Sequence, residues 1–130
     1  MWCTSLNQNG ISELKNLTEL NVECNSKVEN VNHLTKLTTL YAQGYCGINQ
    51  NGISKLKNLT QLYVGSNSKI TNVNFLTKLN ILHAQKNSGI NQDGISCLKN
   101  LTELNTYYNS KIRIEWFNSI NYIVCNLLFY

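Results

Sequence analysis

The chain has 130 residues, 42% of them apolar and none of them proline, which is enough for one domain with a buried core. Its formal net charge of +4 is too small to indicate a nucleic-acid or membrane partner by itself. The composition, which includes 22 asparagines, also argues against a collagen, a disulfide-knotted mini-protein and a membrane span.

A repeat of 42 residues organises most of the sequence. Residues 11–52 and 53–94 align without a gap, and 27 of the 42 aligned positions are identical. All twelve apolar positions of the first copy recur in the second, and a third copy begins at Ile95. Self-similarity at a fixed period is typical of a solenoid, in which stacked units cover one another.

Each copy divides into two rungs of 20 and 22 residues with a shared spacing of apolar residues. The spacing is Leu-x-x-Leu-x-Val-x-x-Asn, first seen at Leu17, Leu20, Val22 and Asn25. It recurs five times in register between residue 5 and about residue 112, and it resembles the leucine-rich repeat family. Some rungs are similar to the short repeats of internalins, and the segment GINQNGISKLKNL is similar to ribonuclease-inhibitor-like repeats. The resemblance implies an α/β repeat solenoid, right-handed, with a parallel sheet on the concave face and short helices or turns on the convex face.

Strands are expected where inward side chains alternate with outward ones. Leu20 and Val22 lie two positions apart, which is the period of a β-strand. One such strand cannot bury its own apolar row, whereas five or six stacked in parallel can. The predicted strands lie near 19–22, 39–42, 61–64, 81–84, 103–106 and 121–125.

Buried asparagines are expected where the strands end, because their amides can satisfy backbone groups that a turn leaves unpaired. Tyr45-Cys46 replaces the asparagine pattern in one rung, which predicts a local irregularity there. The asparagines in question are Asn25, Asn67, Asn87 and Asn109.

Tight turns and short helices are expected on the convex side. The pairs Asn9-Gly10, Asn51-Gly52 and Asp93-Gly94 predict turns, since these residue types tolerate a positive φ. The segments that follow them are predicted to form short helices or turns, with their Ile and Leu side chains facing inward. These segments lie near 11–16, 53–58 and 95–100.

Both ends depart from the repeat within what is expected to be a single domain. Residues 1–10 form a partial rung, 11–112 form five rungs, and 113–130 form a degenerate C-terminal rung or cap, with its strand shifted by one residue. Covering side chains are available at each end. The alternative to a cap is a docking surface for a missing part of the chain or for a second copy, with self-association through the uncapped N-terminal end. The covering residues are Trp2 at one end, and Trp116, Phe117, Leu127, Leu128, Phe129 and Tyr130 at the other.

The cysteines and the N-terminus predict the compartment. Five cysteines are an odd number and include no Cys-x-x-Cys pair, and the N-terminus has no basic stretch followed by an apolar run. An intracellular, cytoplasmic location is therefore expected. The sequons at Asn16, Asn58 and Asn100 recur at the 42-residue period, so they are better explained as copies of the repeat than as glycan sites.

No catalytic pattern is found, so neither an enzyme nor a cofactor is predicted. His33 and His83 form no Ser/His/Asp or Cys/His grouping, and the sequence holds a single Asp. Cys24 and Cys46 lie in adjacent rungs, where structural thiols are the default and a metal or thiol site is the alternative. The lysines of the convex face are not interleaved with aromatic residues, so nucleic-acid binding is not expected. Those lysines are Lys15, Lys57, Lys99, Lys36 and Lys78.

The outward side chains of the strands form three columns on the concave face. Neighbouring strands lie about 4.8 Å apart, so Tyr41, Tyr63 and His83 are expected to stand side by side as an aromatic stripe. Nine of the 15 differences between the two full copies fall in or beside the strands, which favours a binding role over drift of an unselected surface. The candidate partner-binding residues are Tyr41, Tyr63, His83, Gln43, Gln85, Glu103, Asn105 and Tyr107.

The sequence therefore predicts a non-catalytic protein-protein interaction module. Its partner, a protein or peptide on the concave face, is what the family resemblance implies. The alternative is the target-recognition part of a larger enzyme assembly, such as a ubiquitin ligase. An adaptor-type helical segment upstream of Met1 would favour this alternative.

Overall fold

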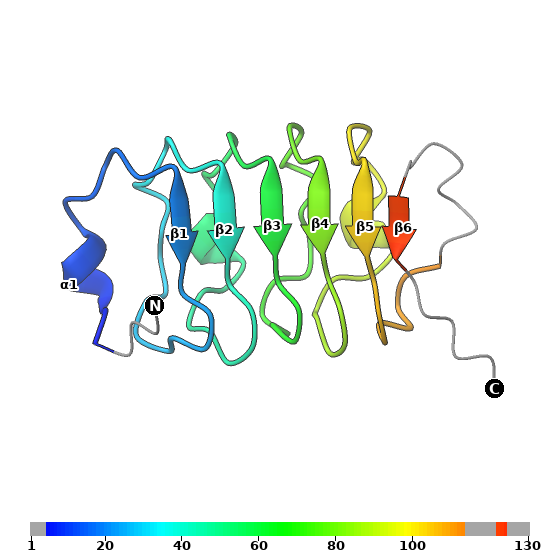
Figure 1. Cartoon of the computed structure of the whole chain (residues 1–130), viewed down its shortest axis with the longest axis horizontal. Helices are drawn as coiled ribbons and strands as arrows, with labels where there is room; N and C mark the ends of the chain where they lie inside the picture. Colours follow the sequence, from blue (N-terminus) through cyan, green and yellow to red (C-terminus); the bar gives the residue numbers. More distant parts are fainter. Residues whose placement is uncertain (1–4, 114–121, 125–130) are drawn as a thin grey trace.

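The computed structural model describes residues 5–113 and 122–124. These residues form a parallel β-solenoid, in which one short strand from each rung joins a single sheet (Figure 1). The six strands lie side by side in chain order, and every pairing is parallel. They are β1 (Glu19–Asn21), β2 (Thr39–Tyr41), β3 (Gln61–Tyr63), β4 (Ile81–His83), β5 (Glu103–Asn105) and β6 (Tyr122–Val124).

The strands confirm the predicted parallel sheet. Each of the first five begins at its predicted residue and ends one residue earlier, and β6 lies within its predicted range. The register pairs Leu20 with Leu40 and Leu40 with Leu62, so a short rung of 20 residues is followed by a long rung of 22. The same alternation continues through β4 and β5. Leu104 then pairs with Ile123, which confirms the shift by one residue in the last rung.

The core lies between the sheet and the returning chain, and it is built from the recurring Leu, Ile and Val positions. Leu14 is an exception to the predicted inward pattern: it is 43% exposed, whereas its equivalent Leu56 is 1% exposed. A complete rung precedes Leu56, but among the described residues only a partial rung precedes Leu14. The central strand leucines are buried throughout, namely Leu20, Leu40, Leu62, Leu82 and Leu104.

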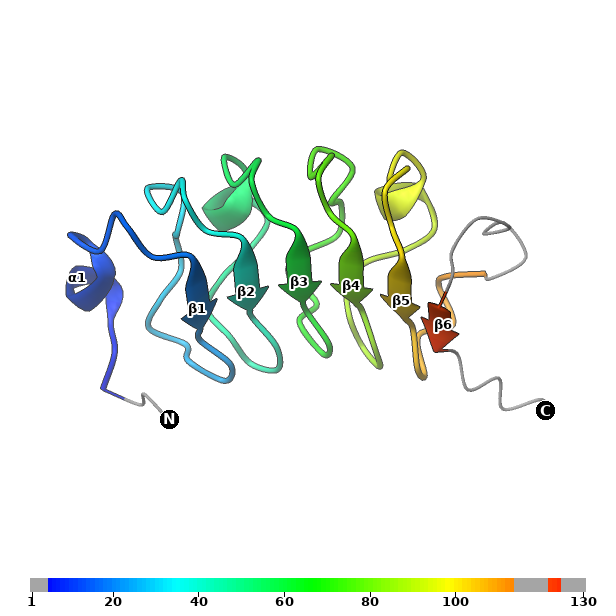
Figure 2. The same cartoon turned by 45° about the horizontal axis from the view of Figure 1, so that its top comes forward.

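Single helical turns lie on the side of the solenoid opposite the sheet (Figures 1 and 2). They are α1 (Gln8–Ile11) and two 3₁₀ turns, η1 (Asn51–Ile53) and η2 (Asp93–Ile95). The prediction of helices or turns on this side is therefore right, but the helical residues begin earlier than predicted. The Asn-Gly and Asp-Gly pairs lie inside the helical turns rather than before them.

The positive φ predicted for the three Asn-Gly and Asp-Gly pairs is wrong. Gly10, Gly52 and Gly94 do not have a positive φ, whereas Gly44, in the described chain, does. Close backbone approach explains Gly52 and Gly94 instead, because a Cβ on Gly52 would overlap the carbonyl oxygen of Glu29. The equivalent Gly94 lies in the same way against Thr71. Glycine thus lets the backbones of adjacent rungs touch.

Replacing Gly52 by alanine is expected to lower the free energy of unfolding by about 1–3 kcal/mol, because one of the two backbones must move. Gly10→Ala is the matched control, since its Cβ would meet Leu6 Cδ1 at 3.3 Å and Asn7 Oδ1 at 3.7 Å, which are side-chain atoms. Urea denaturation measures both variants. An equal loss in the two would contradict the close-approach explanation.

The third residue after each strand from β1 to β5 has a positive φ. In the short rungs the residue that follows it is a buried asparagine. Asn67 Nδ2 donates to the carbonyl oxygens of Ala42 (2.9 Å) and Ile48 (3.1 Å) in the preceding rung. Its Oδ1 accepts a hydrogen bond from Lys69 N at 3.0 Å. Asn109 makes the equivalent bonds one copy later, to Ala84, Ile90 and Lys111. The predicted use of buried amides is confirmed at these positions.

The prediction for Asn87 is wrong. Asn87 is exposed, and the next residue, Ser88, is buried instead. The irregularity expected at Tyr45-Cys46 has the same form, with Tyr45 91% exposed and Cys46 fully buried. Both sites follow the strand of a long rung, whose turn contains an extra residue. The deviation is therefore a regular feature of the long rungs rather than a local fault.

Glutamine side chains also join the rungs, a role that the repeat pattern does not predict. Gln50 Nε2 donates to Asn72 O at 2.8 Å, and its Oε1 accepts from Thr71 N and Asn72 N, both at 3.0 Å. Gln8 bonds in the same way to residues 29 and 30. The sequon residue Asn58 likewise donates to Thr35 O at 2.9 Å, which supports its interpretation as a structural repeat position.

The covering residues proposed for the two ends lie outside the described residues. Those are Trp2 at one end and the aromatic and apolar residues from Trp116 onward at the other. In the part of the chain that the structure describes, no helix has the length and apolar character needed to cross a membrane.

Candidate functional site

The strand face is defined here as the first and last residues of each strand from β1 to β5, together with the residue two positions after the end of each strand. The register aligns them in three columns, as predicted, with Asn21, Tyr41, Tyr63, His83 and Asn105 forming the middle one. Their exposure follows from strand alternation, because the buried leucine at each strand's centre forces its two neighbours outward.

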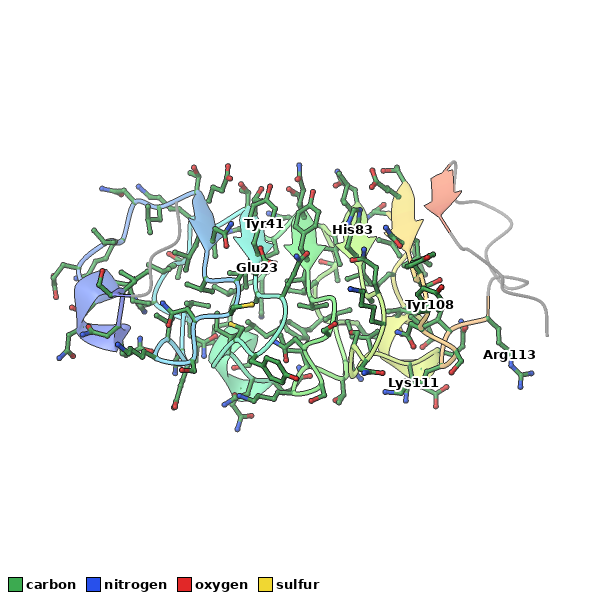
Figure 3. The ribbon with its side chains drawn as sticks, turned by 60° about the horizontal axis from the view of Figure 1, so that its bottom comes forward. Glu23, Tyr41, His83, Tyr108, Lys111 and Arg113 are labelled. Atoms are coloured by element: carbon green, nitrogen blue, oxygen red, sulfur yellow. The ribbon has the colours of Figure 1, made fainter. Side chains whose placement is uncertain are left out.

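The aromatic stripe is present in the middle column. The rings of Tyr41 and Tyr63 are stacked, with centroids 4.4 Å apart and planes 11° apart. His83 meets Tyr63 edge-on, with centroids 4.7 Å apart and planes 71° apart. All three side chains are half-buried, so they still offer surface to a partner. Figure 3 labels Tyr41 and His83 along the strand side of the solenoid.

Electrostatic effects from β1 and β5 reach Tyr63. Burial raises the pKa of Tyr63, and the neighbouring Tyr41, Glu103 and Glu19 raise it further. The phenol therefore stays protonated and can donate, as it does to Gln61 Oε1 at 3.2 Å. The surface is neutral along the stripe and negative at its ends.

His83 and Glu103 form a hydrogen bond that the sequence did not predict, although both were predicted site residues. His83 Nε2 lies 2.6 Å from Glu103 Oε1. The two side chains are 21% and 32% exposed, so the pair is accessible from outside. It fixes the imidazole ring at the β4 end of the stripe.

The third column contains a polar hollow of about 250 Å³ beside the stripe. Gln43 and Gln85 line it, and Gly65 between them contributes no side chain. Gln43 Nε2 donates to Glu23 Oε1 at 3.3 Å. The lining residues are Glu23, Gln43, Gly44, Gly65, Ser66, Gln85 and Lys86.

The two remaining predicted site residues lie apart from this hollow. Asn105 Oδ1 accepts a hydrogen bond from Tyr107 N at 3.1 Å, so this oxygen is used locally. Tyr107 packs edge-on against Tyr108, with ring centroids 4.1 Å apart. The sequence prediction missed Tyr108, which is 54% exposed, and Tyr45. The signal available for both was their place in the turn that follows a strand.

Side chains suited to metal binding are not clustered in the described residues. No group of three His, Cys, Asp or Glu residues there could hold a metal ion. Cys24, Cys46 and Cys97 are free thiols, and burial raises the pKa of the Cys46 thiol, which disfavours the reactive thiolate. His33 Nε2 lies 2.9 Å from Ile11 O and so joins two adjacent rungs.

The geometry defines the molecule as a parallel β-solenoid with an aromatic stripe on its sheet. No protein-family model matches the sequence, and a search of curated proteins finds no match. The case for a functional site therefore depends on the residues of the strand face themselves.

Proposed function

We propose that the protein is a non-catalytic binding module that holds a protein or peptide on its strand face. The observation that carries this proposal is the stacked, half-buried stripe of Tyr41, Tyr63 and His83. These rings add nothing to the core, since the leucine row already fills it. Tyrosine provides a large contact area at low entropic cost together with a hydroxyl group, which is why it is enriched at interfaces.

We also infer that the solenoid is a right-handed leucine-rich repeat whose strand face is concave. The inference is supported by the recurring Leu-x-x-Leu-x-Val-x-x-Asn spacing and by the buried asparagines that close the short rungs. A concave sheet suits the binding role, because solenoids use such surfaces to surround extended partners.

Truncating the centre of the stripe should weaken binding without unfolding the protein. Tyr63→Ala is expected to cost more than 1–2 kcal/mol of binding free energy, and Tyr41→Ala or His83→Ala somewhat less, because central anchors are best shielded from water. Titration calorimetry with a partner captured on the immobilised protein would measure these losses.

The matched control replaces three lysines on the opposite side of the solenoid, Lys15, Lys57 and Lys99, by alanine. This set should leave affinity nearly unchanged apart from a salt-dependent effect on the association rate. If the lysine set abolishes binding and the aromatic set does not, the strand face is not the binding surface.

A further inference from the structure

The strand face is acidic although the whole chain is basic. Its columns contain Glu19, Glu23 and Glu103 and none of the 11 Lys and Arg residues. A chain of net charge +4 thus has −3 in these columns, counting His83 as neutral, and −2 when Lys86, which lines the hollow beside Gln85, is included. Such a separation of charge favours a positively charged partner on the strand face and disfavours an anionic one such as a nucleic acid.

One face of the Tyr41 ring, at the end of the aromatic stripe next to β1, is available for a planar cation. Tyr63 covers one face of the Tyr41 ring, so the opposite face is turned toward β1. The residue opposite Tyr41 on β1 is the small, exposed Asn21, whose Oδ1 is bonded to Glu23 N at 3.0 Å. Glu19 and Glu23 lie on either side of Asn21 and are both exposed, and Figure 3 labels Glu23.

We propose that the strand face binds an arginine-containing basic segment, with one guanidinium group on the open face of Tyr41 between Glu19 and Glu23. This inference rests on the binding function proposed above. A guanidinium group fits because it is planar, stacks on aromatic rings and presents several donors to carboxylates. The pKa-raising effect of Glu19 and Glu103 on Tyr63 is consistent with a negative potential along the stripe.

The sheet also sets the spacing of a second basic residue. Glu103 on β5 lies four strand spacings from Glu19, or about 19 Å. An extended segment that crosses the strands advances about 3.3 Å per residue, so its second cation should lie about six residues from the first. That residue would meet Glu103 beside His83.

A second copy of this chain is a weaker candidate for the occupant. Its convex surface is rich in lysine, but two of those ammonium groups are already bonded to neighbouring rungs. Lys36 Nζ donates to Asn16 Oδ1 and Lys78 Nζ to Asn58 Oδ1, each at 2.7 Å. A lysine also lacks the planar group that the Tyr41 face accommodates best.

The test begins with a displayed library of random twelve-residue peptides, selected on the wild-type protein and counter-selected on Tyr63→Ala. Enrichment of peptides with two arginines about six residues apart supports the proposal. Enrichment of acidic or uncharged apolar peptides overturns it while leaving a strand-face binding function intact. If no peptide is enriched over the Tyr63→Ala variant, both the inference and the proposed function fail.

Fluorescence anisotropy with a selected peptide then tests the position of the arginine. Glu19→Gln combined with Glu23→Gln should weaken binding by about tenfold at low salt, as should citrulline in place of the arginine. The matched control, Glu13→Gln with Glu29→Gln, removes the same charge from exposed positions outside the strand face and should change affinity less than twofold. Equal effects of the two pairs would overturn the proposal. So would concentration-dependent self-association, seen by analytical ultracentrifugation, that the first pair abolishes.

Discussion

Leu62→Ala is expected to lower the free energy of unfolding by about 2–5 kcal/mol. Leu62 is fully buried, and its strand has a rung on each side, with Leu40 and Leu82 opposite it in register. Neither neighbour can close the cavity without moving its own rung. Chemical denaturation followed by circular dichroism measures the loss.

The control for Leu62 is Lys57→Ala, at an exposed position of the same copy. It should change stability by no more than about 0.5 kcal/mol. Similar effects from the two substitutions would mean that the inward and outward faces of the solenoid have been assigned the wrong way round.

Asn67→Ala is expected to cost about 2–4 kcal/mol, because it removes three hydrogen bonds and leaves buried backbone groups without partners. The carbonyl oxygens of Ala42 and Ile48 would lose their donor, and Lys69 N would lose its acceptor. Asn67→Asp should be similarly harmful, since it keeps the acceptor but places a carboxylate against two carbonyl oxygens. Thermal and urea denaturation would measure both.

Asn87→Ala is the matched control, because Asn87 holds the same position after its strand leucine but is exposed. Its replacement should cost no more than about 0.5 kcal/mol. A large loss at Asn87 with a small one at Asn67 would contradict the distinction between short and long rungs.

The sheet could be predicted from sequence because each rung repeats the same constraint. Leu20, Leu40, Leu62 and their equivalents must all face inward, and a shift by one residue would expose the entire row. Their spacing therefore determines the strand positions and the pairing register. The same argument places Tyr41, Tyr63 and His83 in one column from the sequence alone.

The turns were harder to predict because their form depends on contacts between rungs. Asn87 resembles Asn67 in local sequence, yet the extra residue of the long rung moves the buried position to Ser88. Gly52 resembles a turn glycine, but what selects it is the carbonyl oxygen of Glu29, 23 positions earlier. Neither effect can be predicted from the few residues around Asn87 or Gly52.

The candidate site was predictable as a set of positions but not as a set of contacts. The alignment of columns does not reveal that Glu103 reaches back to His83 or that Asn105 bonds to the backbone of the turn that follows its strand. Side-chain torsions decide such pairings, and the repeat does not specify them, because the strand face is where its copies differ.

The alternation of short and long rungs also limits how the gene can change in length. Asn67 matches the carbonyl oxygens of a long rung, and Gln50 matches backbone amides of a short rung. Unequal recombination that removed 20 or 22 residues would join two rungs of the same kind and leave these groups mismatched. Recombination in steps of 42 residues preserves every partner, so alleles or paralogues should differ by whole pairs of rungs.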